Sequence, residues 1–238
     1  MENIYSYVAE NVKRVQDDIN EACIKYGRKP EDVILMGVSK TQPVEKLVQA
    51  HKAGITVFGE NRVQELVQKS DFFKEYNVPC HIIGTLQTNK VKYLPPLTDT
   101  IQSVDSLKLA KEIEKQYGKA GKKANICLEV NIGNEDSKSG IPYEQTMELI
   151  YQLSEFKNLT VKGLMCIPPI DNTEEVRRYF AKMHKLFVDI SDKKLDNINM
   201  SILSMGMSGD YRWAIAEGST LVRVGTALFG ERNYNITK

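Results

Sequence analysis

The sequence lacks every residue pattern that would indicate a metal centre or a disulfide framework. Its four cysteines are far apart and form no Cys-x-x-Cys pair: Cys23, Cys80, Cys127 and Cys166. The histidines share no spacing typical of metal ligands; they are His51, His81 and His184. We therefore expect no metal site, and we expect the cysteines to be reduced core residues of a cytoplasmic protein.

An excess of charge of one sign is also missing, and so is any long apolar run. The formal net charge is +1 over 238 residues, which provides no general attraction to nucleic acid or to an anionic membrane. No segment approaches the run of about 20 apolar residues that spans a bilayer. The N-terminus lacks the basic flank and apolar stretch of a signal peptide. We therefore expect neither nucleic acid nor a membrane as a partner.

Short apolar segments alternate with helical patterns along the whole chain. The predicted strands are 33–38, 56–58, 80–83, 100–104, 125–132, 159–167, 200–204 and 221–224. Seven are followed by a helical pattern, and the last by a short one over 225–230. Such alternation implies right-handed βαβ units and a parallel sheet. Eight repeats in this length favour a single (β/α)₈ TIM barrel over an open doubly wound sheet.

The N-terminal segment 1–27 precedes the first predicted strand. Its apolar residues recur at spacings of three and four over 4–26, and Gly27 follows as a stop, a pattern that predicts one amphipathic helix. We expect this extra helix to plug or flank the base of the barrel. No linker or change of composition divides the chain, so we predict a single domain over 1–238.

The first predicted strand ends on Ser39-Lys40-Thr41. In a barrel of this class, the active site is built at the C-terminal ends of the strands. Lys40 is therefore a candidate for an imine-forming amine. The alternative interpretation is a solvated loop lysine, which is the common state of a single charged residue.

Two later loops carry the features of a phosphate site. Gly206-Met207-Ser208-Gly209 follows the seventh predicted strand, and Gly225-Thr226 follows the eighth. Loops at these two places frequently bind phosphate in TIM barrels, through backbone N–H groups and hydroxyls at helix starts. The alternative is two ordinary capped turns. A phosphate anchor together with an imine lysine fits pyridoxal phosphate, and it also fits a lysine aldolase acting on a phosphorylated sugar.

The order of motifs along nearly the whole chain resembles the pyridoxal phosphate homeostasis proteins, whose barrel is similar to the N-terminal domain of alanine racemase. The motifs are VSKT (38–41), FGENRVQE (58–65), HIIGTLQTNK (81–90), VNI (130–132), SKSG (137–140), GLM (163–165), SMGMS (204–208) and GSTLVRVGTALFG (218–230). The resemblance implies pyridoxal 5'-phosphate (PLP) as the cofactor, held by Lys40 as a Schiff base.

The resemblance also assigns roles to other residues of the site. Arg223 would lie against the pyridine nitrogen, and Asn61 would lie beside the cofactor. The phosphate would be bound by Ser208, Gly225 and Thr226, and the pocket would be walled in part by Met205, Gly206 and Met207. The alternatives are an exposed, salt-bridging Arg223 and an Asn61 that only forms a turn.

These roles favour a cofactor carrier over an enzyme. Arginine donates and stays charged, so Arg223 would keep the pyridine nitrogen unprotonated. Alanine racemase takes its second acid–base group from a β-domain, and we expect no such domain after this barrel. We therefore expect a protein that supplies or buffers PLP for apo-enzymes, without robust catalysis. The alternative is a weak PLP-dependent amino-acid racemase. Lys90 and Lys138 are candidates for secondary sites, although solvated loop lysines are the simpler interpretation.

Overall fold

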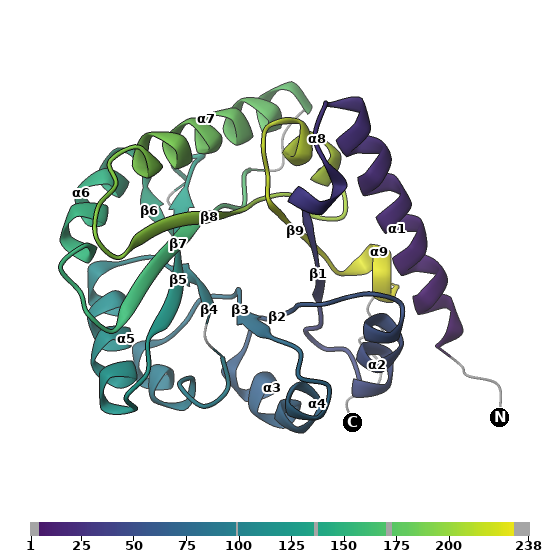
Figure 1. The fold of residues 1–238 in the computed structure, drawn as a ribbon, viewed down its shortest axis with the longest axis horizontal. Coiled ribbons are helices and arrows are strands. Elements are labelled where there is room, and N and C mark those ends of the chain that lie inside the picture. The colour runs from purple at the N-terminus through teal and green to yellow at the C-terminus, as the bar shows by residue number, and fades with distance from the viewer. Residues whose placement is uncertain (1–4, 99, 136–137, 170–172, 231–238) are drawn as a thin grey trace.

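A closed parallel barrel forms the centre of the molecule. The computed structural model describes residues 5–98, 100–135, 138–169 and 173–230, so the predicted helix start at residue 4 and the motif residue Ser137 lie outside it. Within these ranges the barrel strands are β1 (Ile34–Val38), β2 (Phe58–Glu60), β3 (Cys80–Ile82), β4 (Thr100–Val104), β5 (Ala124–Asn131), β7 (Leu159–Met165), β8 (Ile198–Ser204) and β9 (Leu221–Val224). Pairing of β4 with β5 and of β1 with β9 closes the ring (Figure 1). The predicted (β/α)₈ TIM barrel is confirmed.

Helices surround this ring and cover its outer face (Figure 1). In the described ranges the α-helices are α1 (Ser6–Lys25), α2 (Val44–Lys52), α3 (Val63–Gln68), α4 (Ser70–Glu75), α5 (Leu107–Lys119), α6 (Tyr143–Leu153), α7 (Thr173–Ser191), α8 (Tyr211–Ala216) and α9 (Thr226–Phe229). Two 3₁₀ turns, η1 (Pro30–Asp32) and η2 (Thr88–Tyr93), complete the set. The main hydrophobic core lies between the sheet and these helices.

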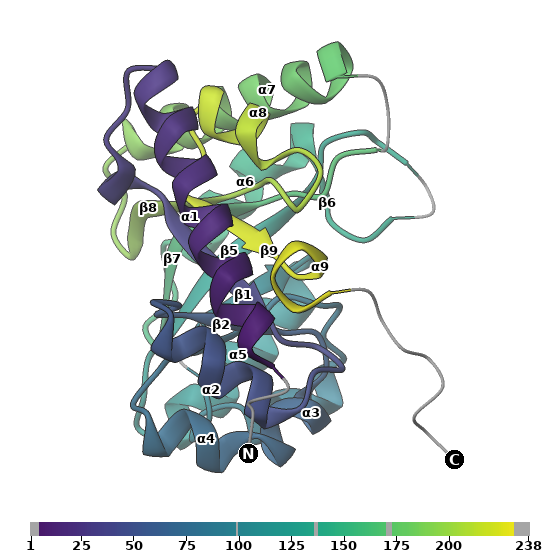
Figure 2. The ribbon, with the colours of Figure 1, turned by 90° about the vertical axis from the view of Figure 1, so that its right-hand side faces the viewer.

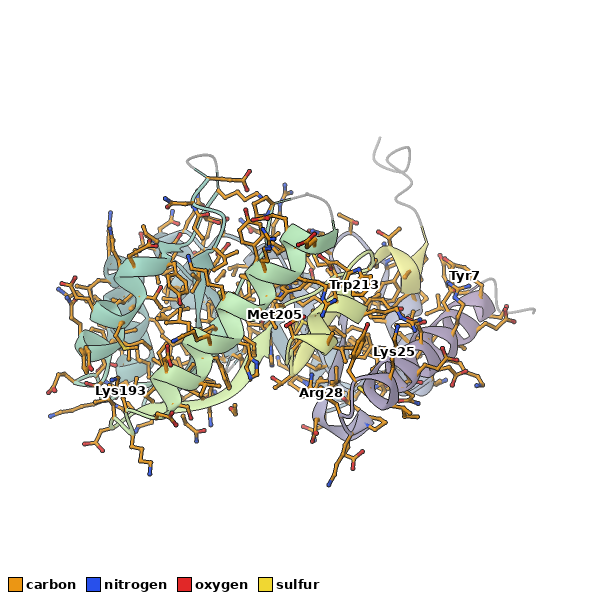
Figure 3. All side chains as sticks on the ribbon, turned by 90° about the horizontal axis from the view of Figure 1, so that it is seen from above. Tyr7, Lys25, Arg28, Lys193, Met205 and Trp213 are labelled. Atoms are coloured by element: carbon orange, nitrogen blue, oxygen red, sulfur yellow. The ribbon has the colours of Figure 1, made fainter. Side chains whose placement is uncertain are left out.

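Helix α1 lies along the outer side of the barrel, between α2 and α8 in Figure 2, and contacts α9 as well. Its apolar stripe, which includes Val8, Val12 and Val15, is buried. Figure 3 shows Tyr7 and Arg28 near opposite ends of this helix. The Tyr7 hydroxyl donates to Phe229 O at 3.1 Å, and Arg28 Nη1 donates to Ile215 O at 3.1 Å. The extra helix therefore ties the start of the chain to its last helices.

Side chains of each strand alternate between the barrel interior and the helix layer. A small interior cluster contains Met36, Val38, Val57, Ile83 and Leu221. It fills the barrel below the C-terminal strand ends, so the interior is packed in its lower part. The cavity described below opens above this cluster.

The second strand begins and ends two residues later than predicted. We expected a strand over 56–58 and a loop from Gly59, but β2 is Phe58–Glu60. The prediction left Glu60 out of the strand, because a charged residue is seldom fully buried in a strand. Glu60 is fully buried here, with Lys69 as its ionic partner at 2.7 Å.

Two other local predictions are corrected. The helical pattern after the second predicted strand forms two helices, α3 and α4, which meet at Lys69. Lys69 also bonds Glu60 and the backbone of Ser39, which are tertiary contacts that a periodic pattern cannot reveal. A two-residue strand, β6 (Ile141–Pro142), pairs with β5 and is absent from the predicted strands.

No helix among the described residues is both long and apolar enough to cross a membrane.

The four cysteines are buried and free. Burial raises the pKa of Cys127 and of Cys166 to about 12, even though Arg223 acts in the opposite direction. The thiolate is the reactive form, so this rise leaves very little of either thiol ionised near neutral pH.

We expect iodoacetamide at slightly alkaline pH to leave both thiols unmodified in the folded protein, as measured by peptide mass mapping. The same treatment in denaturant should modify all four cysteines. Rapid modification of Cys127 or Cys166 in the folded protein would contradict this picture.

Candidate functional site

A cavity of about 270 Å³ opens at the C-terminal ends of β1, β3 and β9, beside the loop after β8. This is the end of a TIM barrel at which function is usually located. The residues that line the cavity and that the sequence singled out are Lys40, Asn61, Met207, Ser208, Arg223, Gly225 and Thr226. Val38, Gln42, Ile83 and Ile167 line it as well, and sequence reasoning missed them.

Lys40 follows the last residues of β1 and is half-buried at the cavity. Strand alternation explains its direction, because Val38 and Met36, which lie two and four residues earlier, belong to the interior cluster. Ser39 lies on the other side of the strand, fully buried under α3 and α4, where its hydroxyl bonds Glu60. The interpretation of Lys40 as a solvated loop lysine is therefore not supported by its position.

Arg223 lies in the middle of β9 and is 4% exposed. Its Nη1 donates to Ser204 O at 2.8 Å and to Ser204 Oγ at 2.7 Å, and its Nη2 donates to Cys166 O at 2.9 Å. In the described residues, no carboxylate forms an ion pair with it. An exposed, salt-bridging Arg223 is thus excluded. Burial lowers the pKa of Arg223, yet a guanidinium stays charged at physiological pH.

A chain of polar side chains continues from Arg223 across the barrel interior. Ser204 Oγ donates to Gln102 Oε1 at 2.6 Å, and Gln102 Nε2 lies 2.9 Å from His81 Nδ1. Because the amide nitrogen is a donor, Nδ1 of His81 acts as the acceptor. No sequence pattern predicted this chain, since its three members come from β3, β4 and β8 and meet only after the barrel closes.

The two predicted phosphate loops lie side by side. Ser208 Oγ accepts a hydrogen bond from Ala227 N–H at 3.5 Å, which joins the loop after β8 to the start of α9. The Asp210 carboxylate accepts from Met207 N–H at 2.6 Å and fixes the first of these loops. Burial raises the pKa of Asp210. The hydroxyls of Ser208 and Thr226 therefore lie on the same side of the cavity.

Met205 and Gly206 do not line the cavity, contrary to the expectation that they wall it. Ser204 faces the interior to meet Arg223, so alternation directs Met205 into the helix layer, where it is fully buried in the main core. Figure 3 shows it on this side, near Trp213 of α8. Gly206 has φ +94°, and an added Cβ would lie 2.6 Å from that of Ala214. Gly206 therefore forms a tight turn that packs against α8.

Asn61 follows β2 and lines the cavity. Gly84, which follows β3, packs against its backbone so closely that an added Cβ would lie 2.6 Å from Asn61 O. A residue larger than glycine at position 84 would therefore displace Asn61. The two loops after β2 and β3 are thus fitted to each other at the rim.

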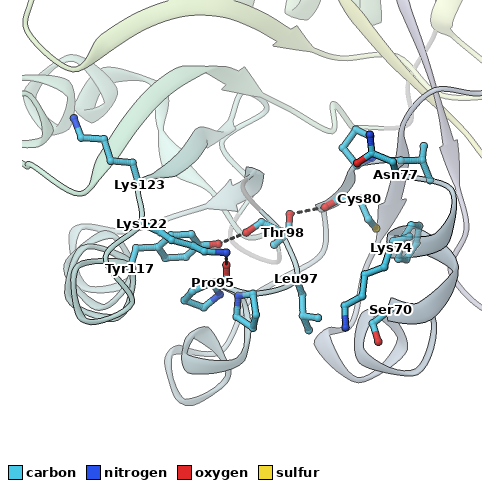
Figure 4. A pocket seen from close by; sticks show the side chains of 14 residues that line it. Ser70, Lys74, Asn77, Cys80, Pro95, Leu97, Thr98, Tyr117, Lys122 and Lys123 are labelled. Atoms are coloured by element: carbon cyan, nitrogen blue, oxygen red, sulfur yellow. Dashed lines mark hydrogen bonds between the residues drawn. The ribbon is translucent and has the colours of Figure 1, made fainter.

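A second cavity, of about 290 Å³, lies at the opposite end of the barrel (Figure 4). Three of its polar side chains donate hydrogen bonds to backbone carbonyls of other lining residues. Lys122 Nζ donates to Pro95 O at 2.8 Å, the Tyr117 hydroxyl donates to Thr98 O at 2.5 Å, and Thr98 Oγ1 donates to Cys80 O. These bonds join the chain segments that enter β3, β4 and β5. We interpret this cavity as structural.

The two loop lysines lie away from the central cavity. Lys138 Nζ is 2.5 Å from Glu135 Oε2 and 3.3 Å from Pro168 O. Lys90 lies beside a separate shallow pocket with Val63, Val67 and Tyr93. Neither position adds a group to the arrangement around Lys40 and Arg223.

Comparison with known proteins identifies the family of this chain. The family described as "Alanine racemase, N-terminal domain" matches residues 12–233. The pyridoxal phosphate homeostasis protein of Aquifex aeolicus (strain VF5) is 43% identical over 226 residues, covering 94% of this chain and 98% of the relative. This chain belongs to the pyridoxal phosphate homeostasis protein family.

Solved structures extend this family assignment to three dimensions. A structure of PipY from Synechococcus elongatus PCC7942 with PLP bound is 32% identical, with a TM-score of 0.81 over 94% of this chain and 100% of that one. An unknown protein from Bifidobacterium adolescentis is 33% identical, with a TM-score of 0.91 over 96% of this chain and 97% of that one. The family barrel is therefore shared across nearly the full length of this chain.

Proposed function

We propose that this member of the pyridoxal phosphate homeostasis protein family binds PLP in the cavity at the C-terminal strand ends. The observation that carries the proposal is the convergence there of three groups of different chemistry: the Lys40 amine, the Arg223 guanidinium, and the hydroxyls of Ser208 and Thr226. They match an aldehyde, a ring nitrogen and a phosphate. The presence of PLP in the structure of PipY supports the assignment.

The residues fit the group as follows. Lys40 would hold PLP as a Schiff base, and Arg223 would donate to the pyridine nitrogen. Ser208, Thr226 and the backbone N–H groups at Gly225 would bind the phosphate, as first-turn N–H groups have no intrahelical acceptor. Asn61 and Met207 would lie against the ring. When bound, PLP supplies an aldehyde carbon that a lysine amine captures reversibly.

We propose storage and supply of PLP to apo-enzymes as the biological role, without robust catalysis. Relatives of 37–43% identity are named homeostasis proteins, which supports this role. The chemistry of Arg223 supports it as well. A charged donor held by Ser204 and Cys166 does not give up its proton to the ring nitrogen and so leaves that nitrogen unprotonated, which makes the ring a weak electron sink.

We further propose that residues 1–238 act as one PLP-binding barrel domain in the cytoplasm. The hydrogen bonds from Tyr7 and Arg28 to the last helices support a single unit. Free, buried thiols support a reducing compartment.

Purified protein incubated with PLP should show the absorbance band of a Schiff base, and borohydride should fix the adduct on Lys40, as located by peptide mass mapping. Lys40→Ala should abolish both the band and the adduct, because no other lysine among the described residues lines the cavity. Lys46→Ala is a matched control, since this lysine bonds Gln42 and Phe229 O rather than lining the cavity. An adduct that persists undiminished in Lys40→Ala would refute the assignment.

Arg223→Ala should keep the Schiff base but change its absorbance spectrum, because the donor to the ring nitrogen is lost. We expect the affinity for PLP to fall about tenfold or more, since a hydrogen bond to a charged group contributes about 1.5–3 kcal/mol. Spectral titration with PLP measures both effects. Complete loss of binding in a folded variant would instead indicate that Arg223 contacts the phosphate.

PLP-loaded protein should restore activity to a PLP-dependent apo-enzyme, and Lys40→Ala treated in the same way should not. The assay follows the activity of the recipient enzyme after free PLP has been removed. Failure of the loaded wild-type protein to restore activity would remove the supply role. Interconversion of L- and D-alanine well above the rate with free PLP would favour the weak racemase instead.

A further inference from the structure

Both peptide groups that flank Lys40 are held by charged side chains from outside the barrel. Lys69 Nζ donates to Ser39 O at 2.8 Å, which belongs to the peptide group before Lys40. Glu65 Oε2 accepts a hydrogen bond from Thr41 N–H at 2.6 Å, which belongs to the peptide group after it. Neither Lys69 nor Glu65 lines the cavity. They bond the backbone on either side of Lys40 from the helix layer, and not from the cavity.

A buried carboxylate anchors this arrangement. Glu60 is fully buried at the end of β2, and its Oε1 accepts from Lys69 Nζ and from Ser39 Oγ, each at 2.7 Å. Lys69, 8% exposed, also lies 3.4 Å from Glu65 Oε2. Burial raises the pKa of Glu60, which the charge of Lys69 partly offsets. The ion pairs therefore link α3, α4 and β2 to the end of β1.

The Glu60 carboxylate is only partly satisfied by hydrogen bonds. Glu60 Oε2 is buried and has no hydrogen-bond partner among the described residues. A buried charged group without its full set of partners destabilises a fold. Apolar residues of similar size would usually be tolerated at such a place. A contribution to the stability of the fold therefore does not explain why this network is present.

The turn that this network holds is strained. Thr41 has φ +62°, a left-handed conformation that is unusual for a β-branched residue. Its hydroxyl donates to Lys40 O at 2.6 Å. Such conformations persist where surrounding contacts enforce them, and they gather at functional sites. The N–H group that Glu65 binds belongs to this same residue.

We propose that Glu60, Glu65 and Lys69 are positioning residues for Lys40. They hold the Ser39–Thr41 turn in the strained geometry that presents the Lys40 amine to an aldehyde in the cavity. This inference rests on the proposed function, in which Lys40 forms a Schiff base. In that step the neutral amine adds to the aldehyde carbon, and one water leaves as the C=N bond forms.

The test measures the first-order rate of Schiff-base formation at saturating PLP, by borohydride trapping at timed intervals and mass mapping of the Lys40 adduct. Glu65→Ala releases the peptide group after Lys40. The double variant Glu60→Gln with Lys69→Met removes the ion pair without leaving a buried carboxylate alone. We expect both to react about 10- to 100-fold more slowly, since small displacements of a reacting group have effects of that size.

Conservative and control variants separate positioning from a loss of folding. Glu65→Gln keeps an acceptor for Thr41 N–H and should react nearly as fast as the wild type. Thr41→Gly adopts the same φ without strain, so it should restore part of the rate lost in Glu65→Ala. Lys74→Met and Glu75→Ala change exposed residues of α4 and should leave the rate unchanged. Circular dichroism verifies the fold of each variant.

Equal rates for the wild type, Glu65→Ala and the double variant, all folded, would overturn the inference. A second aldehyde without phosphate, 4-pyridinecarboxaldehyde, makes this result independent of PLP. If the wild type reacts at Lys40 with this aldehyde but not with PLP, the proposed function fails, while the variant rates still decide whether Lys40 is positioned. If Lys40 reacts with neither aldehyde, the positioning inference fails as well.

Discussion

Closure of the parallel barrel is the constraint on which the rest of this structure depends. Once β4 pairs with β5 and β1 with β9, alternate residues of every strand must face a narrow interior. Arg223, Ser204, Gln102 and His81 meet there although they come from four strands. Because all four side chains are buried, each of them needs a hydrogen-bond partner. The hydrogen-bond chain across the barrel is therefore a consequence of closure as much as a property of the site.

That same alternation decides which parts of the molecule were predictable. The strands β4 and β9 were predicted residue by residue, because each is a short segment bounded by clear turn signals. Lys40 was predicted as a site residue from its place at a strand end, and the family motifs supplied the role of Arg223. Glu60 was assigned to a loop, since its burial depends on Lys69, nine residues away in the sequence. Met205 was placed in the pocket because the motif did not show which face it takes.

Arg223 illustrates why a residue type alone does not define a site. A charged guanidinium that is 4% exposed and bonded to two carbonyl oxygens and a hydroxyl has no need of a carboxylate. Had a carboxylate been its partner, the guanidinium charge would be neutralised and its field at the cavity weakened. The neutral acceptors leave the guanidinium without an ion-pair partner among the described residues, at the wall of the cavity, as the proposed contact with a ring nitrogen would require. The surroundings of the arginine, more than its presence, suit it to a role opposite a lone pair.

The two sides of the Ser39–Thr41 turn have different roles in the proposed function. The inner side of Ser39–Thr41 carries the Lys40 amine, while the outer side carries the hydrogen bonds to Glu60, Glu65 and Lys69. A protein that stores a cofactor must capture it firmly and still release it, and every group that touches the cofactor affects both steps. None of these three residues lines the cavity. They can set how readily the amine reaches its target without altering the contacts that determine affinity, which gives the rate of exchange a control of its own.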